Sequence, residues 1–246
     1  MTTLLSAEWY KLWRGKVLHV ILLCITAQIS LQVFAEFYGG DSPMQGQYGV
    51  TMPAGMSFMM QLWFSAFVGY FIASEFPNGT MRNSLALGKY RTYVYVSKLF
   101  AACVAVAVIY LVSSIVATVG FSLAFGFGDM SLLEFARFFS WNYGMQVLFH
   151  WGFAALLTLI AFISRSPIMT VLVNLAYVIG MLALPTFLTA LGYFDVYKCF
   201  PDYYVMFFEN LSGDSAFIIH GAAMSVAYLV ITCIIGCIVF KRTDIK

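Results

Sequence analysis

Six long stretches of the chain contain no Asp, Glu, Lys or Arg, and they limit the fold more than any other feature. Each has 19 to 27 residues, and they cover 17–35, 54–74, 99–125, 141–163, 168–191 and 217–240. At about 1.5 Å per residue, each is long enough as a helix to cross a hydrocarbon core of about 30 Å. None alternates apolar and polar residues as a barrel strand does. The stretches predict an all-α integral membrane protein with six transmembrane helices.

The composition excludes an ordinary soluble domain, because 62% of the residues are hydrophobic and only 10% are charged. Soluble domains have roughly 45–50% apolar and about 25% charged residues, so this chain has too few polar side chains to cover a water-facing surface. Four of the five cysteines lie in the predicted spans, which gives no disulfide framework.

The basic residues indicate the orientation of the spans. Alternate connections, namely 1–16, 75–98, 164–167 and 241–246, contain 11 of the 13 Lys and Arg but only three of the 11 acidic residues. Since cytoplasmic loops are enriched in Lys and Arg, both termini are predicted to be cytoplasmic. The net charge of +2 then reflects topology and contact with anionic lipid, and no nucleic-acid partner is expected.

The N-terminal segment 1–16 is predicted to be an amphipathic interfacial helix that precedes the first span. One arc of about 100° contains apolar side chains and the opposite side contains polar ones. The apolar set is Leu5, Trp9, Leu12 and Trp13, and the opposite set is Tyr10, Lys11 and Arg14. The alternative is an aromatic and basic flank of the first span, which is common at any membrane boundary.

The connection 75–98, on the predicted cytoplasmic side, contains a short helix. Pro77 and Gly79 interrupt the second span, and Gly88 is placed to end about two helical turns. We therefore expect a helix at about 79–88.

The connection 192–216, on the predicted outer side, is rich in aromatic and acidic residues. Such a density of amphipathic rings favours a short helix or re-entrant element at the outer interface, at about 194–211. The predicted organisation is thus the N-terminal helix 1–16 followed by a single six-helix domain, 17–246.

Polar residues recur every four positions in two predicted spans, so each of these helices has a polar stripe. The first stripe is Gln28, Gln32 and Glu36, and the second is Asn142, Gln146 and His150. Gln28, Gln32, Asn142, Gln146 and His150 are candidates for a substrate path that opens to the outside. The alternative is that they hydrogen-bond between helices and fix the packing.

Motifs for nucleotide or metal binding do not occur in the sequence, and the segment Gly213-Asp-Ser215-Ala, which faintly resembles a nucleophile motif, is better explained by helix capping at Asp214 or Ser215. The longest connection has 25 residues, whereas a nucleotide-binding domain needs on the order of 100. We therefore expect no enzymatic activity and no cofactor in this chain, and any ATP hydrolysis must occur on another subunit.

Taken together, these features resemble the permease subunits of ABC-2-type exporters, over essentially the whole chain. The resemblance rests on the segment Glu8-Trp-Tyr-Lys-Leu-Trp-Arg14, the six spans, the basic end Phe240-Lys-Arg and one connection. That connection reads Glu75 through Gly79-Thr80-Met-Arg82 to Gly88-Lys-Tyr-Arg91. In length the chain is similar to the bacitracin-export and lantibiotic-immunity permeases.

The resemblance implies an exporter that moves a hydrophobic or amphipathic substrate, such as a peptide antibiotic, drug or lipid, out through a bacterial plasma membrane. It implies a dimer with a second permease, identical or a sister subunit, and two ABC ATPase subunits that bind ATP and Mg. The helix at about 79–88 would be the coupling helix that docks on the ATPase. The coupling residues carried over are Glu75, Gly79, Thr80, Arg82, Asn83, Gly88 and Arg91.

Two other functions remain open from the residues alone. A secondary transporter or channel is disfavoured, because no predicted span contains a charged residue that could couple an ion gradient. A membrane scaffold without transport activity is the other alternative. Co-purification with an ATPase would separate the exporter from both.

Overall fold

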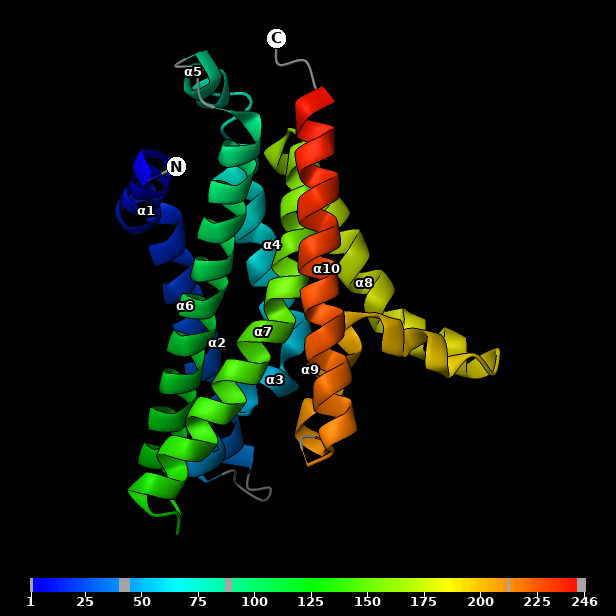
Figure 1. Ribbon diagram of the computed structural model, residues 1–246. Coiled ribbons are helices and arrows are strands. Elements are labelled where there is room, and N and C mark those ends of the chain that lie inside the picture. The colour runs from blue at the N-terminus through cyan, green and yellow to red at the C-terminus, as the bar shows by residue number, and fades with distance from the viewer. Residues whose placement is uncertain (1, 40–44, 87–89, 212, 243–246) are drawn as a thin grey trace.

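The computed structural model describes residues 2–39, 45–86, 90–211 and 213–242, and these form helices and turns without a strand (Figure 1). In chain order the helices are α1 Thr2–Arg14, α2 Lys16–Gly39, η1 Gly46–Tyr48, α3 Met52–Gly55, α4 Ser57–Ala73, α5 Thr80–Ala86, α6 Arg91–Phe125, α7 Leu132–Ser164, α8 Pro167–Ala190, η2 Phe194–Cys199, α9 Pro201–Leu211 and α10 Ser215–Arg242. The two η elements are 3₁₀ helices. The all-α fold predicted from the sequence is confirmed for the described residues.

Five helices, α2, α6, α7, α8 and α10, are long and apolar enough to cross a membrane. The predicted stretch 54–74 is different, because Met56 separates the four-residue α3 from α4, which has 17 residues. A helix of that length extends about 25 Å, which is shorter than a hydrocarbon core of about 30 Å. A sixth unbroken span is therefore not confirmed.

The segment before α4 packs on α6 instead of extending away as a free loop. Gln47 is 4% exposed, and its backbone N–H donates to Phe127 O at 2.8 Å. A Cβ atom on Gly49 would lie 2.5 Å from Thr118 Cα, so only glycine allows the two backbones to approach this closely. The segment thus continues the line of α4 along α6 towards the end of the bundle.

The connection between α7 and α8 is short because both helix ends have suitable residues. Arg165 ends α7 in a left-handed conformation, with φ 52°, and α8 begins two residues later at Pro167. The two long helices therefore reverse direction within a few residues.

The centre of the bundle is formed by α6 and α7. In their most apolar segments 56% and 67% of the residues are buried, against 28% in α2 and 22% in both α8 and α10. The outer helices expose large apolar side chains such as Leu23 and Leu31 of α2 and Ile168 of α8. In water such a surface would aggregate, and in a bilayer it faces lipid.

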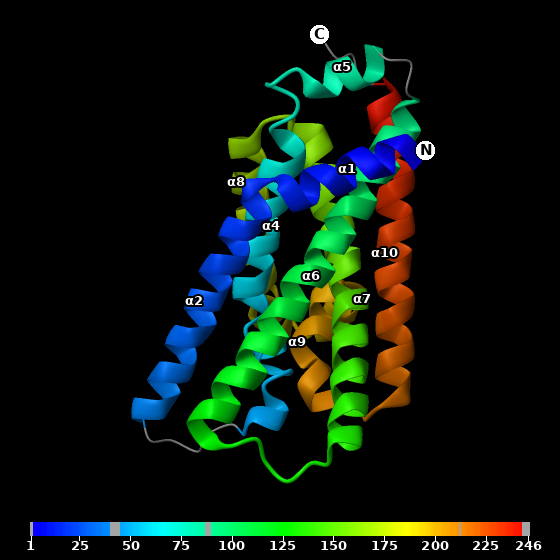
Figure 2. The ribbon, with the colours of Figure 1, turned by 90° about the vertical axis from the view of Figure 1, so that its left-hand side faces the viewer.

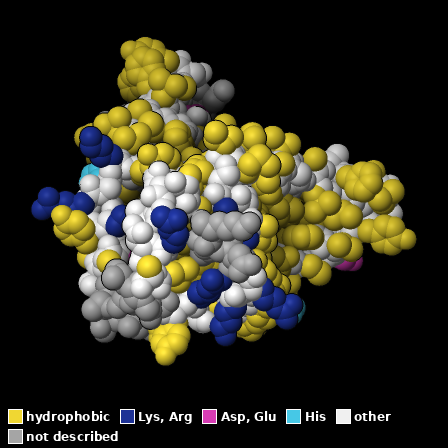
Figure 3. All heavy atoms as spheres, turned by 90° about the horizontal axis from the view of Figure 1, so that it is seen from above, with side chains coloured by type: hydrophobic (Ala, Val, Ile, Leu, Met, Phe, Trp, Pro, Cys, Tyr) yellow, Lys and Arg dark blue, Asp and Glu magenta, His cyan; other side chains and the backbone are white. Residues whose placement is uncertain are grey.

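One end of the bundle carries α1, α5 and the end of α10, and we call it the α5 end (Figures 1 and 2). The connection between α6 and α7 lies at the opposite end. Viewed onto the α5 end, the surface shows many Lys and Arg side chains, whereas the flanks are mainly hydrophobic (Figure 3). The charge asymmetry of the sequence is therefore an asymmetry between the two ends of the molecule.

The last part of α8 and η2 project from the side of the bundle, and α9 returns between α7 and α10 (Figure 1). The aromatic rings of α9 do not line an exposed surface, because Tyr203, Tyr204 and Phe208 are 8%, 4% and 1% exposed. They pack with Phe149 of α7 and Phe217 of α10 in a second hydrophobic cluster. These three rings thus contribute to the protein interior, and the predicted outer interfacial element at about 194–211 corresponds to η2 and α9.

Candidate functional site

The connection from α4 to α5 is a tight turn that fixes the direction of α5. Gly79 has φ 72°, a left-handed conformation that favours glycine. The Met81 backbone N–H donates to Glu75 O at 3.2 Å, and the Thr80 hydroxyl donates to the same oxygen at 3.3 Å. The Met81 side chain is fully buried. Although α5 has only seven residues, it is tied to the end of α4 by this turn and by one buried side chain.

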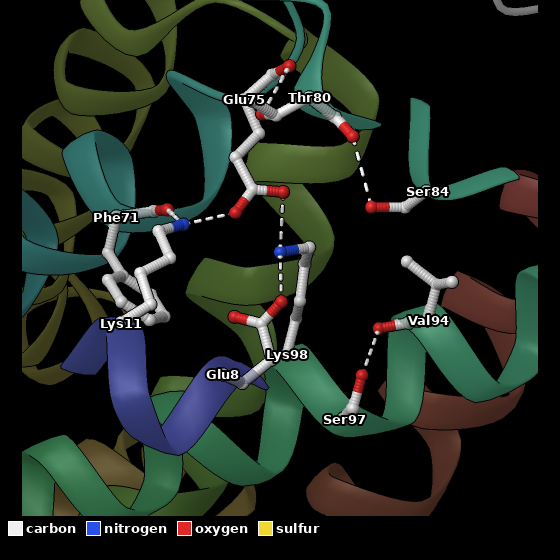
Figure 4. A network of polar contacts seen from close by, with 9 residues as sticks. All are labelled: Glu8, Lys11, Phe71, Glu75, Thr80, Ser84, Val94, Ser97 and Lys98. Carbon is white, nitrogen blue, oxygen red and sulfur yellow. Dashed lines mark hydrogen bonds and ion pairs between the residues drawn. The ribbon is translucent and has the colours of Figure 1, made fainter. Parts of the chain in front are cut away.

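Four charged side chains from three elements form a buried network beside this turn (Figure 4). Lys98 Nζ of α6 lies 2.7 Å from Glu8 Oε1 of α1 and 2.6 Å from Glu75 Oε2. Glu75 Oε1 pairs with Lys11, the second α1 residue in the network. The network has two acids and two bases, so its net charge is zero.

The network can stabilise the fold although it is buried, because its positive and negative charges balance. The Lys98 side chain is 2% exposed and the Glu75 side chain 10%. Removing a charge from water is costly, and the attraction between partners offsets that cost only when every charge keeps its partners. Burial alone raises the pKa of Glu75, but the charges of Lys98 and Lys11 outweigh it and hold this pKa below its usual value. Glu75 is therefore ionised at neutral pH.

The first helix is attached to the bundle by more than the network. The Lys11 ammonium also donates to Phe71 O of α4 at 2.8 Å and lies 4.2 Å from the centre of the Phe71 ring. Leu12 is 1% exposed, whereas Trp9 and Trp13 are 51% and 41% exposed. The predicted arcs are therefore only partly correct, because Lys11 faces the bundle and the two Trp rings face away from it.

The predicted coupling residues fall into different environments. Arg82 and Asn83 are exposed on α5, as is Thr80 at its first position. Glu75 is buried in the network, and Gly79 forms the turn. Gly88 lies outside the described residues.

Arg91, also predicted to contact an ATPase, is part of the bundle itself. Its Nη1 donates to Phe240 O at 3.0 Å and to Lys241 O at 3.3 Å. These are carbonyls in the last turn of α10, where a cation is favoured by the helix dipole. Arg91 thus joins the start of α6 to the end of α10.

The two polar stripes lie on different helices, one on α2 at the periphery of the bundle and one on the central α7. In α2, Gln28 Oε1 accepts from Trp63 Nε1 of α4 at 2.7 Å, and Gln32 Nε2 donates to Glu36 Oε1 at 3.3 Å. Gln28 lines a cavity of about 300 Å³ between α2, α4 and α8. The rest of its lining is mainly apolar and includes Met59, Leu62, Trp63, Val171 and Leu175.

The α7 stripe is inside the bundle. Asn142, Gln146 and His150 are 6%, 1% and 0% exposed. His150 Nδ1 lies 2.7 Å from Gln146 O, and its ring contacts Phe64 of α4 and Tyr110 of α6 at 5.2 and 5.3 Å between ring centres. The Gln146 amide has no hydrogen-bond partner within the described part of the chain. Buried amides without partners are uncommon in stable cores.

Glu8 and Lys98 lie in the segments that carry the family resemblance, but the sequence reasoning assigned no role to them or to Asp202. Glu8 is the only acid in a basic N-terminal segment, which is a weak signal for an internal pair. Lys98 is adjacent to the third predicted span, and Asp202 lies in a connection that was expected to be at the surface. In the described residues, no group of three or more His, Cys, Asp or Glu side chains could hold a metal ion.

A sequence profile described as "ABC-2 family transporter protein" matches residues 4–182. The chain belongs to the ABC-2 transporter family. A search of curated proteins gives no match to it. The part matched by the ABC-2 profile runs from α1 into α8, so it contains the whole charged network and α5. With its five long apolar helices, this ABC-2 family chain is a multi-pass membrane protein of a transport family.

Proposed function

We propose that this ABC-2 family protein is the permease subunit of an ATP-driven exporter. In this proposal α3 and α4 together supply the sixth transmembrane element, both termini are cytoplasmic, and α1 lies in the inner membrane interface. ATP and Mg bind to two separate ABC ATPase subunits, and a second permease, identical or a sister subunit, completes the complex. The membrane is the plasma membrane of a bacterium.

The observation that carries the proposal is the rigid attachment of α5. An ATPase that closes on ATP moves the permease only if the element it pushes transmits the movement. The turn at Gly79 ties α5 to α4, and the network around Glu75 ties the end of α4 to α1 and α6. The exposed Arg82 and Asn83 present hydrogen-bonding groups to a partner. Helix α5 is thus suited to be the coupling helix, with Glu75 and Arg91 as residues that fix the surrounding helices.

The substrate that we propose is hydrophobic or amphipathic, a peptide antibiotic, a drug or a lipid, as for the bacitracin-export and lantibiotic-immunity permeases. The cavity beside Gln28 supports this, because its mainly apolar lining suits a substrate with an apolar part. Gln32 extends the polar stripe from this cavity. The residues Asn142, Gln146 and His150 would belong to a path in the bundle centre that opens when the helices around α7 move apart.

The test is Arg82→Glu in the complex co-expressed with its ATPase. An acid at this position meets like charges if the partner presents carboxylates to Arg82, and like charges across an interface weaken and misplace it. We expect substrate-stimulated ATP turnover in lipid nanodiscs to fall at least tenfold. The amount of permease in the membrane should not change, because Arg82 is exposed and lies outside the spans.

Arg137→Glu is the matched control, since Arg137 is an exposed arginine of α7 at the opposite end of the molecule. It should leave ATP turnover unchanged. If Arg82→Glu binds the ATPase and couples normally, α5 is only a connection. The secondary-transporter, channel and scaffold alternatives would then gain support.

A further inference from the structure

Asp202, in the first turn of α9, is a carboxylate buried inside the bundle. It is 4% exposed, although the sequence places it in a connection between spans. Its Oδ1 accepts from Gln61 Nε2 of α4 at 2.7 Å, and its Oδ2 accepts from the Tyr177 hydroxyl of α8 at 2.8 Å. The carboxylate therefore joins three elements through two neutral donors.

No cation balances this carboxylate within the described residues. The ion pairs there are the network at the α5 end and the pair between Lys198 and Asp195. Lys198 is only four positions before Asp202, but its Nζ lies 2.6 Å from Asp195 Oδ1 on an exposed surface. A buried carboxylate without a counter-charge is costly unless it is protonated or a cation reaches it.

A small, partly open cavity gives a cation access to Asp202. Its volume is about 30 Å³, which is room for one group of the size of a water molecule. Asp202, Gln61, Ser57 and Tyr197 line it, together with apolar residues such as Val178 and Met206. An ionised carboxylate has acceptor sites beyond the two already used by Gln61 and Tyr177, and an ammonium group has three donors.

We infer that this cavity binds the primary ammonium group of an amphipathic molecule, with Asp202 as its counter-charge. The size of the cavity favours a primary ammonium over a trimethylammonium group, which is larger than a water molecule. The inference rests on the proposed function in one respect, namely that the molecule with the ammonium group is the exported substrate. Binding of that group needs neither the ATPase nor transport.

The test is binding to the purified full-length protein in nanodiscs of zwitterionic phosphatidylcholine, which carries no primary amine. The probes are octylammonium, octyltrimethylammonium and octanol, which share an alkyl chain and differ in the head group. Dissociation constants are measured by the change in tryptophan fluorescence and by the shift in unfolding temperature. We expect octylammonium to bind at least tenfold more tightly than either of the other two probes.

Asp202→Asn should abolish this preference, because the amide keeps its size but loses the charge. Asp195→Asn is the matched control, since Asp195 is an exposed acid of the same connection, and it should keep the preference. Val178→Leu is a second variant, which keeps Asp202 and adds one methylene to the lining of the cavity. It should weaken octylammonium binding at least tenfold.

Equal affinity of the wild type for the three probes would overturn the inference, and this comparison does not depend on any variant folding. A folded Asp202→Asn protein that still prefers octylammonium would also overturn it. Asp202 would then be a protonated residue that only joins α4, α8 and α9. Neither result bears on the Arg82→Glu test, which measures ATP turnover, so the two proposals fail separately.

Discussion

Lys98 lies at the centre of the buried ion-pair network that holds the helices together at the α5 end. Its ammonium contacts both Glu8 and Glu75, so this buried side chain of α6 is joined both to α1 and to the residue that follows α4. Glu75, predicted from the sequence as a residue that touches the ATPase, instead lies inside the molecule. A residue can therefore belong to a family motif because it positions the contact surface, without being part of that surface.

Lys98→Met should destabilise the protein by roughly 3–5 kcal/mol, because it leaves Glu8 and Glu75 buried with only Lys11 to balance them. The measurement is the free energy of unfolding in nanodiscs, with tryptophan fluorescence reporting the environment of Trp9 and Trp13. Lys198→Met is the control, since its pair with Asp195 is exposed and should contribute little. Equal effects of the two variants would show that the network is not a stabilising unit.

The low pKa of Glu75 predicts a dependence of stability on pH. Since the folded pKa lies below the ordinary value of 4.5, the unfolded chain binds more protons. The contribution of Glu75 is therefore complete above about pH 5 and is lost as the pH falls through the folded pKa. A titration of unfolding free energy from pH 7 to pH 3 should show this loss in the wild type. Glu75→Gln should be less stable at pH 7 and should lose less on acidification.

At the scale of elements, the segment from η1 to α4 is the least regular part of the bundle. It consists of a 3₁₀ turn, a four-residue helix and a short helix where the sequence shows one apolar stretch. The segment lies against α6 because Gly46 and Gly49 have no side chains to keep the two backbones apart. The position of the start of α4 relative to α6 therefore depends on close packing at these glycines and not on the length of α4.

Gly49→Ala should disrupt this packing, because the new Cβ would lie 2.5 Å from Thr118 Cα, and backbone atoms cannot move aside as a flexible side chain can. We expect a loss of roughly 1–3 kcal/mol in unfolding free energy. Gly144→Ala in α7 is the control, since no atom within 4 Å meets its Cβ, and it should be neutral or stabilising. If Gly49→Ala is as stable as the wild type, η1 does not need this close approach.

The helical elements were predictable from sequence, whereas their contacts were not. A stretch such as 99–125 must be helical in lipid, because every backbone polar group needs a partner within its own segment. The break at Met56 does have a signal in the sequence, since Pro53 and Gly55 directly precede it, but the apolar stretch is interpreted as one span in spite of them. The contact between Glu8 and Lys98 joins residues 90 positions apart, and the burial of Asp202 depends on the return of α9 into the bundle. Such pairings depend on how helices pack, which residue spacing does not encode.

At the scale of the whole molecule, the two ends are chemically different, with α1 and α5 at one end and the α6–α7 connection at the other. This polarity is what the proposed orientation requires, because the basic end would face the cytoplasm and anionic lipid. The central position of α6 and α7 leaves α2, α8 and α10 at the periphery, where lipid or a second permease would contact them.

The proposed orientation predicts the labelling of single cysteines in intact cells. In a Cys199→Ser background, which removes the exposed native cysteine, Asp129→Cys should react with a membrane-impermeant maleimide. Asn83→Cys on α5 should react only after the cells are opened. Labelling of Asn83→Cys from outside would reverse the orientation and remove α5 from reach of an ATPase. Equal labelling of both sites in intact cells would mean an even number of spans between them, whereas the proposed orientation has one, α6.

The separation of 90 residues between Glu8 and Lys98 has a consequence for synthesis of the protein. At a rate of roughly 5–20 residues per second, the third span follows α1 from the ribosome by about 5–20 s. During that interval the N-terminal helix lacks Lys98, and for most of it Glu75 has not been made either. Its own basic residues and two Trp rings suit a temporary position on anionic headgroups. Docking of α1 can therefore only follow insertion of the third span, and it would mark a late step in the assembly of this end of the bundle.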